Sequence, residues 1–142
     1  MKEKIVVGSD HAGFELKEGI KSYLEKKGYE VLDVGTDSAE SVDYPDYAYK
    51  VADEIKDDIK GILVCGSGVG VSIAANRRKG VRAALAFNTE IAKLSRQHNN
   101  ANVICLSGRF TSLEDAKKIV DVFLKTPFST EERHGKRVKK LG

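Results

Sequence analysis

Short apolar runs alternate with amphipathic stretches along the whole chain. The runs are rich in β-branched residues and each predicts a buried strand; they span 5–7, 29–34, 61–65, 81–87 and 102–106. The stretches between them repeat apolar residues three or four positions apart, which is the spacing of one helix face. Helices are therefore expected from about 14 to 28, after Asp46, over 71–79, after Asn88, after Ser112 and, as a basic helix, at about 130–141.

This alternation predicts an α/β fold, because buried parallel strands need helices on both faces of their sheet. We expect a single-domain, Rossmann-like three-layer αβα sandwich with a five-stranded parallel sheet over all 142 residues. Asp46, Asn88 and Ser112 are expected to cap the helices that follow them, since their side chains accept hydrogen bonds from free N–H groups. Ile91 and Leu113 are expected on buried helix faces.

One strand end combines a thiol with a glycine-rich loop. Cys65 closes the run 61–65 and is followed by Gly66-Ser67-Gly68-Val69-Gly70. Glycines allow a tight turn and a close approach to a ligand, and the first N–H groups of a following helix favour an anion. A thiol at such a position tends to hold more thiolate. The segment offers a base or nucleophile beside an oxyanion site, although a small buried side chain remains the alternative. Cys105, in mid-strand without such a loop, is assigned to the core.

Composition narrows the class of protein. With 41% hydrophobic and 32% charged residues, the chain is typical of a soluble globule. A net charge of +3 argues against a nucleic-acid partner, and no apolar stretch approaches a membrane span or a signal peptide. Two cysteines at unrelated spacing indicate neither a disulfide framework nor a metal site, which fits a cytoplasmic location.

Ligands of such sheets bind beyond the carboxyl ends of the strands. That rule brings Asp10 and His11, which follow the first strand, together with the Cys65 loop, and it leaves Gly108-Arg109 open as a further member of this edge. His98 ends the fourth helix and is expected near the same strand ends. Asp10 is compatible with helix capping, with chemistry, or with both. Arg133 and Arg137 lie four positions apart, which suits either a phosphate clamp or a solvated basic tail.

Spacing excludes two phosphate-binding motifs. A P-loop needs a lysine after its last glycine, whereas Gly70 is followed by Val71 and Ser72. A dinucleotide fingerprint would open the first helix, and this chain carries its glycines in the third unit. A thiolate base, backbone donors, histidines and arginines remain. Together they suit proton abstraction next to the carbonyl of a sugar phosphate.

Five separated motifs also occur in a characteristic order. They are Gly8-Ser9-Asp10-His11-Ala12-Gly13, Asp43-Tyr44-Pro45, Cys65-Gly66-Ser67-Gly68-Val69-Gly70 with Ser72-Ile73-Ala74-Ala75-Asn76, Ser95-Arg96-Gln97-His98-Asn99, and Arg133-His134 with Arg137. Through them the chain resembles, over essentially its full length, the family of ribose-5-phosphate isomerase B and the galactose-6-phosphate isomerase subunits.

The resemblance implies a cofactor-free aldose–ketose isomerase, acting on ribose 5-phosphate and ribulose 5-phosphate in the pentose phosphate pathway. It assigns Cys65 as the base that moves a proton between C2 and C1. Asp10 and His98 assist ring opening, with His98 as the acid. The backbone N–H groups of Gly66, Ser67, Gly68, Val69 and Gly70, together with the Ser67 hydroxyl, hold the enediolate oxygen.

The resemblance also implies the substrate ligands and the assembly. The phosphate ligands are His11, Arg109, Arg133 and Arg137; Asn99 binds a sugar hydroxyl and Tyr44 walls the pocket. The protein is expected to form a homodimer, possibly a tetramer, whose active site is completed across the interface. His98, Asn99 and Arg109 are expected to reach in from the partner.

Ser67 stands where many relatives have threonine, and others replace the cysteine with a carboxylate, so Cys65 marks the thiol-using type. Two alternatives stay open. One is an isomerase of a six-carbon sugar phosphate, allose 6-phosphate or galactose 6-phosphate. The other is a non-catalytic phosphosugar-binding protein, which would need neither Cys65 nor His98.

Overall fold

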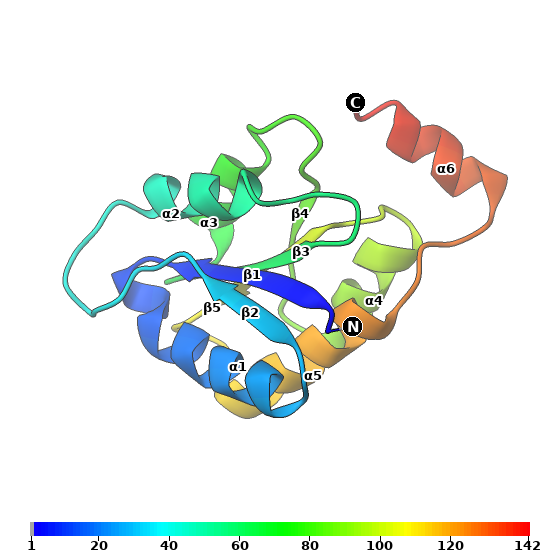
Figure 1. The fold of residues 1–142 in the computed structure, drawn as a ribbon. Coiled ribbons are helices and arrows are strands. Elements are labelled where there is room, and N and C mark those ends of the chain that lie inside the picture. Colours follow the sequence, from blue (N-terminus) through cyan, green and yellow to red (C-terminus); the bar gives the residue numbers. More distant parts are fainter. Residues whose placement is uncertain (1) are drawn as a thin grey trace.

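A five-stranded sheet with helices on both faces forms the body of the protein (Figure 1). The computed structural model describes residues 2–142. The strands are β1 (Lys4–Ser9), β2 (Glu30–Asp33), β3 (Lys60–Cys65), β4 (Ala83–Leu85) and β5 (Val103–Ser107). The helices are the 3-10 turn η1 (His11–Gly13), α1 (Phe14–Lys26), α2 (Tyr44–Ala52), α3 (Val69–Ala75), α4 (Thr89–Gln97), α5 (Leu113–Lys125) and α6 (Glu132–Lys139).

Every strand pair is parallel, and the order across the sheet is β2-β1-β3-β5-β4. The predicted three-layer α/β sandwich is therefore confirmed. β3 lies at the centre, where Val7 pairs with Ile62 and Cys65 pairs with Ser107. The carboxyl ends of β1, β3 and β5 consequently meet at one edge of the sheet, which places the segments that follow them side by side.

Each face of the sheet carries its own apolar core. Ile5, Ile62 and Ile104 pack with α1, α4 and α5, while Val6, Leu63 and Cys105 pack with α2 and α3. The alternation follows from the strand period of two, which sends successive side chains to opposite faces. Strands buried on both faces read as continuous apolar runs, which is why the sequence displayed them so clearly.

Helix starts were predicted correctly where a capping side chain is present. Asn88 Oδ1 accepts a hydrogen bond from the Ile91 N–H at 2.8 Å, and Ser112 Oγ accepts one from the Asp115 N–H at 3.1 Å. Asp46 is not a cap, because α2 already begins at Tyr44. Pro45 occupies the first turn there, where a fixed φ and a missing N–H cost nothing.

Other boundaries and faces also differ from the prediction. The helix expected over 71–79 runs from Val69 to Ala75, and the strand expected over 81–87 is reduced to β4. Ile91 and Leu113, expected on buried faces, are 44% and 36% exposed. Both lie in the first turn of a helix, where the chain is only beginning to cross the sheet, so a helical period alone does not bury them.

The basic C-terminal segment forms α6, which stands apart from the sheet after an extended linker (Figure 1). His134 is its buried residue, with a side chain that lies against α4 through a ring stack on His98. No helix within residues 2–142 is long and apolar enough to cross a membrane.

Candidate active site

Cys65 ends the central strand and is 5% exposed. Its Sγ accepts a hydrogen bond from the Gly68 N–H at 3.2 Å. Gly68 makes this contact with φ +83°, a left-handed conformation in which glycine is unstrained and most other residues are not. The loop 66–70 therefore turns back on itself and directs a backbone donor at the sulfur.

Cys105 has a different environment. It is fully buried in mid-strand, and burial raises the pKa of its thiol, with a further increase from the neighbouring Cys65. A thiol held neutral in this way is a poor nucleophile. The assignment of Cys105 to the core is confirmed.

The loop after Cys65 uses two of its N–H groups internally. Gly68 donates to the sulfur, and Val69 donates to Ser67 Oγ at 3.2 Å. Within residues 2–142 the N–H groups of Gly66, Ser67 and Gly70 form no hydrogen bond. These three groups are thus available to an oxyanion, and the Ser67 hydroxyl helps to shape the loop by accepting the Val69 N–H.

The turn after β5 is joined to the Cys65 loop. The Gly108 N–H donates to the Cys65 carbonyl at 2.8 Å, and the Arg109 N–H donates to the Gly66 carbonyl at 3.1 Å. The Arg109 guanidinium lies against Gly66: a Cβ added to this glycine would be 3.2 Å from Arg109 Cζ. Arg109 therefore lies beside the Cys65 loop of its own chain, where the strand-end rule would bring it, and apart from His98 of the same chain.

The segment after β1 supplies Asp10 and His11 at the same edge. Asp10 Oδ1 accepts a hydrogen bond from the Gly13 N–H at 3.1 Å, so the capping role is confirmed, and the residue is 7% exposed. His11 Nδ1 accepts a hydrogen bond from the Val42 N–H at 3.1 Å, which leaves Nε2 as the protonated nitrogen of the neutral ring.

Tyr44 closes one side of the loop. A Cβ on Gly70 would lie 2.7 Å from Tyr44 Cε1, so only a glycine at this position leaves room for the ring. Tyr44 thus lies at the carboxyl edge, against the loop that follows Cys65.

His98 lies at the opposite end of the sheet. α4 starts after the carboxyl end of β4 and runs back, so that His98 and Asn99 come just before β5 begins. The His98 ring stacks on the ring of His134 of α6 with centroids 4.3 Å apart and an interplanar angle of 10°. The expectation that His98 lies near the strand ends that carry Cys65 is wrong within one chain.

The chain thus assembles two groups of predicted site residues. The first, at the carboxyl edge, contains Asp10, His11, Tyr44, Cys65, the loop 66–70 and Arg109. The second, around the end of α4 and α6, contains His98, Asn99, Arg133 and Arg137. Arg133 also contacts Glu131, with Nη2 and Oε2 3.1 Å apart.

Comparison with known proteins identifies the family of the chain. The family model described as Ribose/Galactose Isomerase matches residues 5–141. The chain belongs to this family. It is 45% identical over 141 residues to ribose-5-phosphate isomerase B of Escherichia coli, covering 98% of this chain and 94% of that protein.

Two solved structures of this isomerase family share the fold. A ribose 5-phosphate isomerase from Thermotoga maritima superimposes with a TM-score of 0.95 at 54% identity, covering 99% of this chain and 98% of that one. Ribose-5-phosphate isomerase B from Mycoplasma genitalium with bound ribulose-5-phosphate gives 0.93 at 47% identity, covering 97% and 93%.

Ser107, beside the Cys65 loop, was missed in the sequence, as was the stacking role of His134, which was named there only within a motif. Ser107 is buried; its hydroxyl donates to the Gly66 carbonyl at 2.7 Å and accepts from the Phe110 N–H at 3.0 Å. His134 supports the His98 ring. The position of Ser107, a polar residue directly after an apolar strand, was the available signal; the stack of His134 has none in the sequence. Among residues 2–142, no cluster of three or more potential metal ligands occurs.

Proposed function

We propose that the protein is a ribose-5-phosphate isomerase that interconverts ribose 5-phosphate and ribulose 5-phosphate through an enediolate, without a cofactor, in the pentose phosphate pathway. The observation that carries the proposal is the Cys65 thiol at the end of β3, with the Gly68 N–H donated to its sulfur, in a chain of the isomerase family. Two buried, unpaired cysteines fit a reducing cytoplasm.

Cys65 acts as the base. Its thiolate removes the proton from C2 of the open-chain aldose, and the C–H electron pair forms the C1–C2 double bond while the carbonyl pair moves to O1. The proton then returns to C1, and O2 becomes the carbonyl oxygen as its own proton passes to O1. The free N–H groups of Gly66, Ser67 and Gly70 face the developing oxyanion, where fixed donors are most effective.

The phosphate is held by His11 and Arg109 from the first group and by Arg133 and Arg137 from the second. Planar guanidinium groups suit this task because each offers two parallel donors to phosphate oxygens. Asn99 binds a sugar hydroxyl, Tyr44 walls the pocket, and Asp10 with His98 opens the ring. His98 acts as the acid.

Because the two groups lie at opposite ends of one chain, we assign the complete site to a homodimer. Each site takes its thiol group from one protomer and His98, Asn99, Arg133 and Arg137 from its partner. Exposed apolar side chains on α3 and after β4 and β5 support a covered face: Val69, Ile73, Phe87 and Phe110.

A direct assay tests the proposal. Purified protein is given ribose 5-phosphate and ketose formation is followed, with allose 6-phosphate and galactose 6-phosphate in parallel. Higher kcat/KM for ribose 5-phosphate is the expected result. Binding of all three sugars without turnover would instead identify a phosphosugar-binding protein and overturn the proposal.

A further inference from the structure

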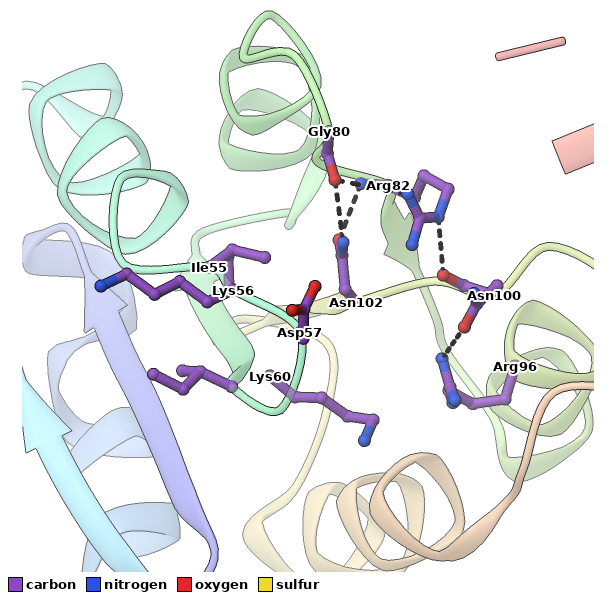
Figure 2. A pocket seen from close by; sticks show the side chains of 10 residues that line it. Ile55, Lys56, Asp57, Lys60, Gly80, Arg82, Arg96, Asn100 and Asn102 are labelled. Carbon is purple, nitrogen blue, oxygen red and sulfur yellow. Dashed lines mark hydrogen bonds between the residues drawn. The ribbon is translucent and has the colours of Figure 1, made fainter. Parts of the chain in front are cut away.

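A cavity of about 360 Å³ opens at the amino edge of the sheet, away from Cys65 (Figure 2). It lies between the turn before β3, the segment before β4 and the segment after α4. This volume falls within the range of small-molecule sites. None of the residues assigned above to the isomerase reaction lines it.

Three cationic side chains converge on this cavity: Lys60, Arg82 and Arg96 (Figure 2). Arg96 is 7% exposed, and the other two are partly buried. Within residues 2–142, no carboxylate lies within 4.0 Å of any of the three. A buried charge without an opposite charge nearby is costly, so a negative charge that the neighbouring side chains do not supply would stabilise the three cations.

The guanidinium groups are held by neutral oxygens only. Arg96 donates from Nη1 to the Ala101 carbonyl at 2.6 Å and from Nε to the Thr126 carbonyl at 3.0 Å. Arg82 donates from Nε to the Asn100 carbonyl at 2.8 Å, and Asn100 Oδ1 accepts from Arg96 Nη1 at 2.9 Å. These bonds fix the two arginines on either side of Asn100 and leave both charges unneutralised (Figure 2).

The three charges also act on one another. Burial lowers the pKa of all three groups; the charge of Arg96 lowers the pKa of Lys60 further, and that of Arg82 does the same to Arg96. Glu3 and Asp58 oppose this effect at Lys60. Asp57 is the one acidic residue in the lining, on an exposed turn, against four cations once Lys56 is included.

We propose that this cavity binds a small phosphate-bearing anion between Lys60, Arg82 and Arg96. Arginine forks fit phosphate oxygens in pairs, and the room left beside them suits a small phosphomonoester. A bound phosphate, with a charge of about −2 at neutral pH, offsets most of the three positive charges that the chain itself leaves uncompensated. The site lies at the opposite edge of the sheet from Cys65. A ligand bound there is therefore expected to raise the free energy of unfolding before it affects turnover.

The test is calorimetric titration of the whole protein with inorganic phosphate and, separately, with glycerol 2-phosphate, at constant ionic strength set with chloride. Arg137→Ala is the background, because it weakens the phosphate subsite of the proposed isomerase site. In that background Lys60→Gln and Arg82→Gln are each expected to weaken the remaining binding by about ten-fold or more, since each removes a charge-assisted contact.

Lys60→Arg keeps the charge and should retain binding, and Lys118→Gln, an exposed lysine on α5, is the matched control. Tighter binding of the ester identifies a phosphorylated metabolite as the ligand class, and equal affinities identify free phosphate. Unchanged binding in Lys60→Gln and Arg82→Gln, or no binding in the Arg137→Ala background, overturns the proposal. Isomerase activity of Lys60→Gln is recorded separately, so that loss of this site and failure of the proposed function are distinguished.

Discussion

At the scale of single residues, the same chemical group takes opposite roles in two places. Cys65 and Cys105 lie on the same face of neighbouring strands, two residues apart in register. Cys65 receives a backbone N–H at its sulfur, whereas Cys105 is sealed in the core. On the proposed mechanism, position at a strand end, rather than residue type, separates the thiol that acts as the base from the structural one.

Replacement of Cys65 by alanine is expected to reduce kcat by at least about a hundred-fold, because a methyl group cannot accept the C2 proton. Sugar-phosphate binding and the circular dichroism spectrum should change little. Cys105→Ala is the control: it shortens a core side chain but leaves the base in place, so its kcat should remain near that of the parent. Comparable kcat values for Cys65→Ala and the parent would remove Cys65 from the mechanism.

A second residue-level prediction concerns the buried Lys17, whose Nζ lies 2.8 Å from Asp33 Oδ1 and donates to the Thr36 carbonyl at 2.6 Å. Burial alone would raise the pKa of Asp33, but hydrogen bonds from Lys17, Gly35 and Lys21 hold it below its ordinary value. Asp33→Asn removes the 2.8 Å ion pair of the buried Lys17, whose nearest remaining carboxylate is Glu18 at 3.6 Å, and should cost about 3–5 kcal/mol at pH 7 in urea unfolding.

Because the pKa of Asp33 is lower in the folded than in the unfolded chain, its contribution is present above the unfolded value and is lost as pH falls through the folded one. The gap between parent and Asp33→Asn should therefore shrink below about pH 4. The double variant Lys17→Met/Asp33→Asn should be more stable than Asp33→Asn alone. A gap that stays constant from pH 7 to pH 3 would contradict this account.

At the scale of helices and strands, the sequence was most informative where local chemistry decides a boundary. Asn88 and Ser112 were recognised as caps because one side chain and one N–H group suffice. Ile91 was misplaced because its exposure depends on where α4 meets the sheet, which is a tertiary property. The strand order, with β5 between β3 and β4, likewise depends on long-range pairing and has no local signature.

The caps allow a matched test. Ser112→Ala removes the acceptor for the Asp115 N–H and should lower the free energy of unfolding by about 1 kcal/mol. Asp43 precedes α2 without a side-chain cap bond, so Asp43→Ala should cost distinctly less. Urea unfolding of both variants measures the difference. Equal losses would show that the Ser112 bond contributes no net stability.

α6 carries the predicted phosphate clamp. Arg137→Ala should raise KM for ribose 5-phosphate by about ten- to a hundred-fold, because one charge-assisted contact is lost, while kcat changes less. Arg137→Lys should restore KM only in part, since it keeps the charge but not the fork. Competitive inhibition by inorganic phosphate should weaken in parallel. An unaltered KM in Arg137→Ala would leave α6 as a solvated basic tail.

At the scale of the whole molecule, the two groups of site residues lie at opposite ends of the sheet. Their types and their motifs were readable in the sequence, because each is a short local pattern. Their separation was not, because it follows from the direction of α4 and from the stack of His134 on His98. Arg109 is different: the strand-end rule brings Gly108-Arg109 to the Cys65 edge, and hydrogen bonds between the turn after β5 and the Cys65 loop fix it there.

Mixing two inactive variants tests the divided site. Cys65→Ala and His98→Asn homodimers should each be impaired, but exchange of protomers creates dimers in which one site holds both an intact Cys65 and an intact His98. Random exchange gives mixed dimers in about half of the population, so activity should recover to about a quarter of the parent value. Sites built within single chains would give no recovery on mixing.

The distance between Cys65 and His98 within one chain also ties turnover to protein concentration. On the proposed arrangement, a dissociated protomer has Cys65 from one active site and His98 from the other, so it has no complete active site and no activity. Specific activity should therefore fall on dilution below the dissociation constant of the dimer, and bound substrate, which bridges both protomers, should hold the pair together at lower concentration. The sugar phosphate would then stabilise the dimeric form of the enzyme that converts it.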